Sequence, residues 1–137
     1  MIKAVIFDLD NTLLDFIKMK REAVMNALLS MKEAGLEINI EDSYKKVMLI
    51  YEAEGWEHQQ VFDKFLKDKI GYVDNKYLAA AIVAYRRGKE ANLKAYPNVH
   101  RTLNHLMKSG IRLAIVSDAP SRDCLLYTSD AADETTG

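Results

Sequence analysis

The chain has 137 residues, of which 49% are hydrophobic and 28% are charged, and its formal net charge is −1. This composition excludes wholesale disorder, and the small net charge gives no reason to expect nucleic acid or an acidic membrane as a partner. Because no apolar run is long enough to cross a bilayer and the amino terminus has no secretory pattern, we expect a cytoplasmic protein. The single cysteine, Cys124, excludes an internal disulfide framework and agrees with that compartment.

The first predicted element is a buried strand that runs into an acidic turn. Residues 4–7 are Ala-Val-Ile-Phe, and an Asp-Leu-Asp-Asn-Thr turn follows at 8–12. Such a run is typical of a parallel sheet, whose carboxyl edge is where open α/β folds bind ligands. Asp8 and Asp10 fall on one side if the strand geometry persists, so either one of them is protonated or both need a cation such as Mg²⁺. The structural alternative is an Asx-rich turn in which Asp10 or Asn11 hydrogen-bonds its own backbone.

Four amphipathic helices are predicted next, because apolar residues recur at intervals of three and four between residues 16 and 90. Short polar or glycine-containing links separate them, and each helix has an apolar stripe on one face. We therefore expect residues 16–90 to form a small all-helical domain. The helices are predicted at about 16–35, 41–55, 57–70 and 75–90.

A second buried strand closes the pattern. Proline at position 97 breaks the helical spacing, and a short helix is predicted from Val99 to the Ser-Gly pair at 109–110. Residues 111–116 are Ile-Arg-Leu-Ala-Ile-Val, and they run into Ser117. The order strand, helical insertion, helix, strand predicts an α/β fold whose core, residues 1–15 and 91–123, is a βαβ-type unit with parallel strands.

Residues 4–15, an apolar strand ending in Asp-x-Asp-x-Thr and followed by Leu-Leu-Asp, resemble motif I of the haloacid dehalogenase-like (HAD) hydrolases. The strand ending at Ser117 resembles motif II of the same family. The resemblance implies part of a Rossmann-like HAD core with an inserted all-helical cap at 16–90. Residues 8–16 and 81–87 look more closely like an archaeal HAD group often labelled glyceraldehyde 3-phosphate phosphatase.

The same resemblance implies the chemistry of a phosphatase. Asp8 is the expected nucleophile, Asp10 the expected general acid and then base, and both are expected to bind Mg²⁺. Thr12 is expected to support the turn, while Ser117 and the backbone N–H of Asp118 are expected to bind the phosphoryl group. The implied partner is a small phosphorylated metabolite, with glyceraldehyde 3-phosphate as one candidate. The sequence does not predict an oligomeric state.

Other conspicuous residues are assigned to the surface or to the core. For Lys18, Lys20 and Arg21, at the start of the first helix, a surface role is favoured over contact with substrate. The three histidines share no metal-ligand spacing, and Tyr44, Tyr51 and Trp56 are expected in the core of the helical domain.

The end of the chain has a different character. Residues 124–134 resemble the conceptual translation of a sequencing adapter, so we expect 124–137 to be a non-native tail; the alternative is a genuine short helix with an acidic tail. HAD enzymes need a lysine and a second acidic motif after motif II, and neither has room here. A second hypothesis is therefore a truncated HAD fragment that does not turn over substrate.

Overall fold

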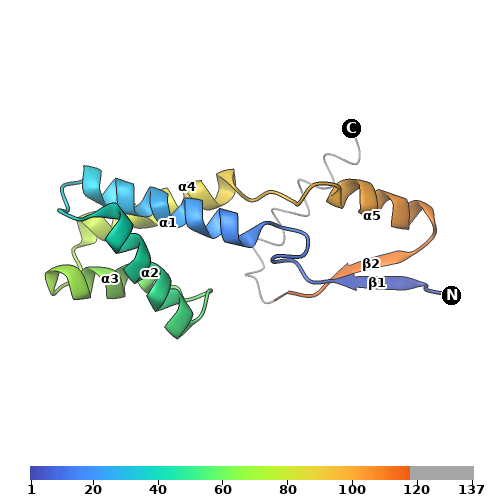
Figure 1. Ribbon diagram of the computed structural model, residues 1–137, viewed down its shortest axis with the longest axis horizontal. Coiled ribbons are helices and arrows are strands. Elements are labelled where there is room, and N and C mark those ends of the chain that lie inside the picture. The colour runs from blue at the N-terminus through green and yellow to red at the C-terminus, as the bar shows by residue number, and fades with distance from the viewer. Residues whose placement is uncertain (118–137) are drawn as a thin grey trace. The chain divides into compact units, whose positions relative to one another are not determined.

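A computed structural model describes residues 1–117 and divides them into two compact units (Figure 1). The first, which we call the strand unit, comprises residues 1–17 and 93–117; the second, the helical unit, is Lys18–Asn92. No helix in the described part of the chain is both long and apolar enough to span a membrane. The elements in chain order are β1 (Ala4–Phe7), α1 (Phe16–Glu33), α2 (Ile40–Glu54), α3 (Val61–Ile70), α4 (Asn75–Ala91), α5 (Val99–Lys108) and β2 (Arg112–Ile115).

The strand unit is built on a parallel pair of strands. β1 and β2 lie side by side in a register that runs from Ala4 opposite Arg112 to Phe7 opposite Ile115 (Figure 1). The pairing is continued past the last register position by the Val116 amide, which donates to the Phe7 carbonyl at 2.9 Å. Helix α5 packs against β2. The predicted α/β fold with parallel strands is thus confirmed.

The sheet is less buried than the apolar sequence of its strands indicates. Val5 and Phe7 are half-buried, whereas Ile6 is 67% exposed, so β1 is not covered on both faces as the sequence predicts. The reason is that this unit buries only a small apolar cluster in the described residues. The buried members of this cluster are Leu9, Leu13, Leu14 and Val99.

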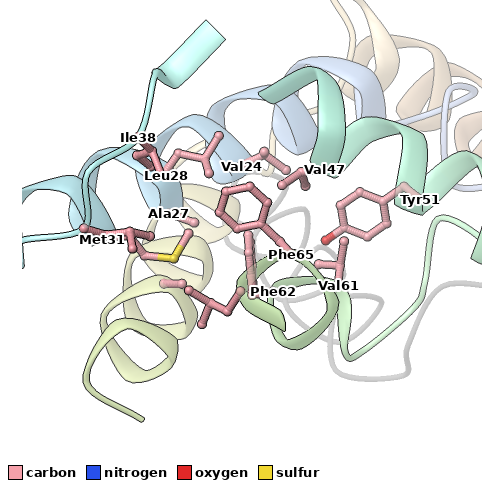
Figure 2. Close-up of a cluster of buried hydrophobic side chains, with 13 residues drawn as sticks. Val24, Ala27, Leu28, Met31, Ile38, Val47, Tyr51, Val61, Phe62 and Phe65 are labelled. Atoms are coloured by element: carbon pink, nitrogen blue, oxygen red, sulfur yellow. The ribbon is translucent and has the colours of Figure 1, made fainter. Parts of the chain in front are cut away.

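The helical unit has a substantial core of its own. Apolar side chains from α1, α2, α3 and α4 meet there, and Figure 2 shows the ring of Phe65 lying among side chains of the neighbouring helices. Tyr51 and Phe65 are among the largest side chains that are completely buried. The buried members are Val24, Ala27, Leu28, Met31, Leu36, Ile38, Val47, Tyr51, Val61, Phe62, Phe65, Leu66 and Ala81.

Local capping sets the boundaries of α2 and the start of α4. The Asn39 side chain accepts a hydrogen bond from the Asp42 amide at 2.9 Å, and α2 ends at Gly55, whose φ of 101° favours glycine. Asp74 caps α4 in the same way, accepting from the Lys76 amide at 2.9 Å. These boundaries agree with the sequence-based ones to within a residue or two.

Helix α3 is the exception, because it begins at Val61 rather than near residue 57. The Trp56 carbonyl, which a helix starting there would use, instead accepts a hydrogen bond from the Lys20 ammonium at 2.7 Å. The His58 amide donates back to the Gly55 carbonyl at 3.1 Å. Residues 55–60 therefore form a turn held by α1, and the helix starts after it.

Helices α1 and α4 approach closely at Gly88. A β-carbon added to Gly88 would lie 2.9 Å from the Ala23 α-carbon and 2.6 Å from the Asn26 side-chain nitrogen. Real β-carbons essentially never come so near to backbone atoms, so this crossing requires glycine.

Candidate active site

Several backbone amides in and after the acidic turn donate hydrogen bonds to one carbonyl group. The Leu9 carbonyl accepts hydrogen bonds from the amides of Leu13 at 2.9 Å and Leu14 at 3.0 Å, and the Thr12 amide lies at 3.4 Å from it. Asn11 has a φ of 59°, the left-handed conformation that asparagine tolerates better than most residues. The side chains of Leu9, Leu13 and Leu14 are buried. Burial on one side of the turn therefore fixes the backbone that carries the polar residues.

A returning segment of the same unit braces this turn. The Tyr96 amide donates to the Leu13 carbonyl at 2.9 Å, and the Asp15 amide donates to the Lys94 carbonyl at 3.2 Å. The Tyr96 hydroxyl also lies 3.5 Å from Asn11 Oδ1. For residues 96–98 the sequence predicts only a break in the helical pattern. The signal that could have indicated this bracing is Pro97, which favours an extended residue before it, suited to pairing with another segment.

The two carboxylates of the turn differ in exposure. Asp8 is exposed and directly follows β1, and its Oδ1 accepts a hydrogen bond from the Leu9 amide at 2.9 Å. Asp10 is half-buried, and its backbone pairs with that of Leu14 in an isolated bridge. The first carboxylate is thus the accessible one, while the second lies within the folded turn.

Ser117 lies at the same edge of the sheet. Because the pairing of β2 with β1 extends through Val116, Ser117 leaves β2 where Asp8 leaves β1. The strand unit thus brings Asp8, Asp10 and Ser117 to one edge, with Thr12 exposed in the turn beside them. Asp118, also expected in the site, and the tail at 124–137 lie outside the described residues.

The donor set of this edge suits a hard cation. Carboxylate and carbonyl oxygens are the ligands that Mg²⁺ prefers, and Mg²⁺ is often held by only one or two carboxylates together with waters and substrate phosphate. In residues 1–117, no group of three or more His, Cys, Asp or Glu side chains is placed to hold a metal ion. Asp8 and Asp10 therefore fit the Mg²⁺ chemistry as a partial ligand set.

The helical unit contains a buried lysine that the sequence does not predict. Lys20 is 4% exposed, and its ammonium donates to the Trp56 carbonyl and to the Tyr85 hydroxyl, each at 2.7 Å. The same nitrogen lies 3.9 Å from the centroid of the Tyr51 ring, within cation–π range. The surface role favoured for Lys20 is therefore wrong, because two hydrogen bonds and an aromatic face compensate its burial.

Burial also shifts the pKa of a tyrosine in the helical unit. The pKa of Tyr51 is raised to about 12 by burial, against an opposing effect of its hydrogen bond with Tyr85, and the charge of Glu57 raises it further. At the surface, the hydrogen bond and charge of Lys64 lower the pKa of Glu54. Both shifted groups belong to the helical unit rather than to the acidic turn.

Comparison with known proteins identifies the class of this fold. A protein of Thermotoga maritima that carries the name beta-phosphoglucomutase superposes with a TM-score of 0.65 at 25% identity, over 90% of this chain and 53% of its own. A HAD hydrolase of Bacillus subtilis, whose structure was determined bound to magnesium, gives a TM-score of 0.63 at 20% identity, over 96% of this chain and 59% of its own. The fold is thus that of the HAD hydrolases.

Sequence comparison gives the same family. The haloacid dehalogenase-like hydrolase family profile matches residues 2–132, and the chain belongs to that family, which confirms the expectation from motif I. The glyceraldehyde 3-phosphate phosphatase of Methanopyrus kandleri is 40% identical over 119 residues, which are 85% of this chain and 51% of that protein. The chain therefore spans about half the length of the curated relatives it matches.

Proposed function

We propose that the complete protein represented by this chain is a Mg²⁺-dependent phosphomonoesterase that acts on a small phosphorylated metabolite. The observation that carries the proposal is the placement of Asp8, directly after β1, at the sheet edge where Ser117 leaves β2. Glyceraldehyde 3-phosphate is the first substrate to test, because a relative with 40% identity bears that name. The helical insertion, expected at residues 16–90, would be the cap that covers the substrate.

Asp8 is the nucleophile in this proposal. Its exposed carboxylate oxygen attacks phosphorus, and the bond from phosphorus to the alcohol oxygen breaks as the aspartyl-phosphate forms. The hydrogen bond from the Leu9 amide supports this role, because it fixes one carboxylate oxygen and so orients the other. Water then attacks phosphorus, which releases phosphate and regenerates Asp8.

Asp10 is the proton donor and acceptor. It gives a proton to the departing alcohol oxygen and later takes one from the attacking water, the two roles of general acid and general base. Its half-buried position in a turn braced by main-chain hydrogen bonds supports this role, because a carboxyl group on a fixed backbone has less entropy to lose in the reaction.

The phosphoryl group would be bound by Ser117 and by the backbone N–H of Asp118, with Thr12 supporting the turn. Mg²⁺, held by the Asp8 carboxylate and the Asp10 backbone carbonyl, would neutralise charge on the transferring phosphoryl group. The Thr12 amide donates to the Leu9 carbonyl at 3.4 Å, so the backbone of Thr12 belongs to the turn that its side chain would support.

The second candidate function is a non-catalytic one for the 137-residue chain alone. One observation favours it: in the described residues, Asp8 and Asp10 have no third metal-ligating side chain with them. The chain would then hold the nucleophile and the acid without the lysine and second acidic motif that HAD catalysis requires.

The test compares two proteins on p-nitrophenyl phosphate and glyceraldehyde 3-phosphate with Mg²⁺. We expect turnover by the product of an uninterrupted gene and none by the 137-residue chain. In the longer protein, Asp8→Asn is expected to reduce turnover to background, while the matched control Asp42→Asn, at an exposed position of α2, retains it. Undiminished activity of Asp8→Asn would refute the nucleophile assignment, and turnover by the 137-residue chain would refute the non-catalytic alternative.

A further inference from the structure

A groove with an apolar floor lies between α2 and α3 in the helical unit, and the proposed phosphatase function does not account for it. Its volume is about 660 Å³, and its apolar lining residues are Leu49, Ile50, Ala53 and the buried Phe65. Leu49 is 63% exposed, so water reaches this part of the floor. Helices α2 and α3, which supply the lining residues, are in contact with each other.

The rim of the groove is positively charged. Four lysines and two acidic residues line it, and one of these lysines, Lys64, pairs with Glu54. Within residues 1–117, the ammonium groups of Lys46, Lys67 and Lys69 form no ion pair. Three lysines and one carboxylate, Asp68, thus line the groove without an ion pair in the described part of the chain, which leaves an excess of positive charge beside the apolar floor.

We propose that this groove binds a free fatty acid of medium chain length. The alkyl chain would cover the floor around Leu49, and the carboxylate would lie against the unpaired ammonium groups of the rim. The volume falls in the range of small-molecule sites, roughly 300–1,000 Å³. The groove is lined by ten described residues, fewer than the roughly 20–30 residues that each side of a stable protein interface contributes. A small anionic amphiphile thus fits both the size and the charge.

The binding experiment is a calorimetric titration of the 137-residue chain with sodium decanoate below its micelle concentration. We expect saturable binding with one site per chain, weakened when NaCl is raised from low to high concentration. Decyltrimethylammonium, which has the same alkyl chain and the opposite charge, is expected to bind at least about tenfold more weakly, since the rim repels it.

Two substitutions locate the site. Leu49→Asp is expected to weaken decanoate binding at least about tenfold, because it removes apolar floor and adds a negative charge. The matched control is Leu29→Asp on α1, since Leu29 is 44% exposed and lies outside the groove; it should bind decanoate like the unmodified chain. Lys67→Glu is expected to weaken binding about two- to fivefold, as loss of one exposed charge pair does. Circular dichroism of each variant verifies its helix content.

Five results would overturn the proposal. Four concern binding: no saturable binding of decanoate, equal binding of the cationic amphiphile, equal losses in Leu49→Asp and Leu29→Asp, and binding of the chain to anionic vesicles without binding of monomeric decanoate. A fifth is self-association of the chain that Leu49→Asp abolishes and decanoate does not affect, which would make the groove an interface between copies. None of these readouts depends on phosphatase activity, so the proposed function and this inference fail independently.

Discussion

The helical unit and the strand unit differ in how much apolar surface each buries on its own. In the described part of the chain, the helical unit holds a cluster of thirteen buried side chains, whereas the cluster of the strand unit has four. Yet the polar residues expected to carry the chemistry, Asp8, Asp10 and Ser117, all belong to the strand unit. Stability and proposed chemistry are therefore carried by different parts of the sequence.

The difference in buried apolar surface follows from the type of secondary structure in each unit. Four amphipathic helices can turn their apolar stripes toward a common centre, so a helical bundle buries its apolar surface without a further layer. A parallel sheet needs helices on both faces, and within residues 1–117 the helix that packs against the two strands of this unit is α5. The sheet thus keeps exposed side chains such as Ile6, while the acidic turn is stabilised by its own leucines and main-chain bonds.

The largest expected effect comes from opening the core of the helical unit. Phe65→Ala should lower the free energy of unfolding by about 3–5 kcal/mol, because it removes a fully buried ring and leaves a cavity. The measurement is chemical denaturation followed by the fluorescence of Trp56, the single tryptophan of the chain. The control Tyr72→Ala, at a ring that is 57% exposed, should stay within about 0.5 kcal/mol. Equal effects of the two substitutions would contradict an independent core in this unit.

A smaller effect, with an unusual sign, is expected at the crossing of α1 and α4. Alanine normally stabilises a helix relative to glycine by about 1 kcal/mol. Gly88→Ala should instead destabilise by about 1–3 kcal/mol, because its methyl group would overlap the Ala23 backbone. Ala79→Gly, at an exposed position of the same helix, is the control and should cost about 0.5–1 kcal/mol. Thermal unfolding gives both values, and stabilisation by Gly88→Ala would show that the helices can separate at little cost.

These contacts mark the limit of what the sequence could predict. Helix bounds were predictable because capping is local: Asn39, Gly55 and Asp74 each act on residues next to them. The start of α3 was not, because the Lys20 ammonium that holds the Trp56 carbonyl comes from 36 residues earlier in the chain. The burial of Lys20 has the same cause, since its partners on α4 and in the turn at 55–60 are distant in sequence.

The candidate site shows the same division. The residue types and spacing of the turn at 8–12 are a local pattern, and the parallel strands place Ser117 beside it, so the gathering of these residues could be anticipated. The bracing of the turn by Lys94 and Tyr96 could not, because it depends on where the chain returns after the helical unit. The roles assigned to Asp8, Asp10, Thr12, Ser117 and Asp118 stay predictions until the variants are assayed.

Alkaline pH offers a graded way to weaken the helical unit. The pKa of Tyr51 is about 12 in the folded chain, above the value near 10 expected after unfolding, so as pH rises the unfolded chain loses this proton first. The stabilisation that arises from the raised pKa of Tyr51 is fully present below pH 10 and is lost as pH rises through 12. At pH 11 the free energy of unfolding is lower by about 1.4 kcal/mol for this reason. Denaturation at pH 8 and pH 11 should show this extra loss in the unmodified chain relative to Tyr51→Phe. Tyr72→Phe is the matched control for removing one phenol, and identical pH dependence of the unmodified chain and Tyr51→Phe would contradict the cause given for the shift.

The smallest effect is expected on the exposed face of β1. Ile6→Thr should change the free energy of unfolding by no more than about 0.5 kcal/mol, because water already reaches most of this side chain. Val47→Thr in α2 makes a comparable exchange at a fully buried position, and there the hydroxyl should cost about 1–3 kcal/mol. Denaturation of the two variants gives the pair of values. If Ile6→Thr costs as much as Val47→Thr, the outer face of β1 is covered in solution, and the strand unit buries more apolar surface than its four-residue cluster indicates. A small effect means instead that the acidic turn depends on its own leucines and main-chain bonds, with little support from that face of the sheet.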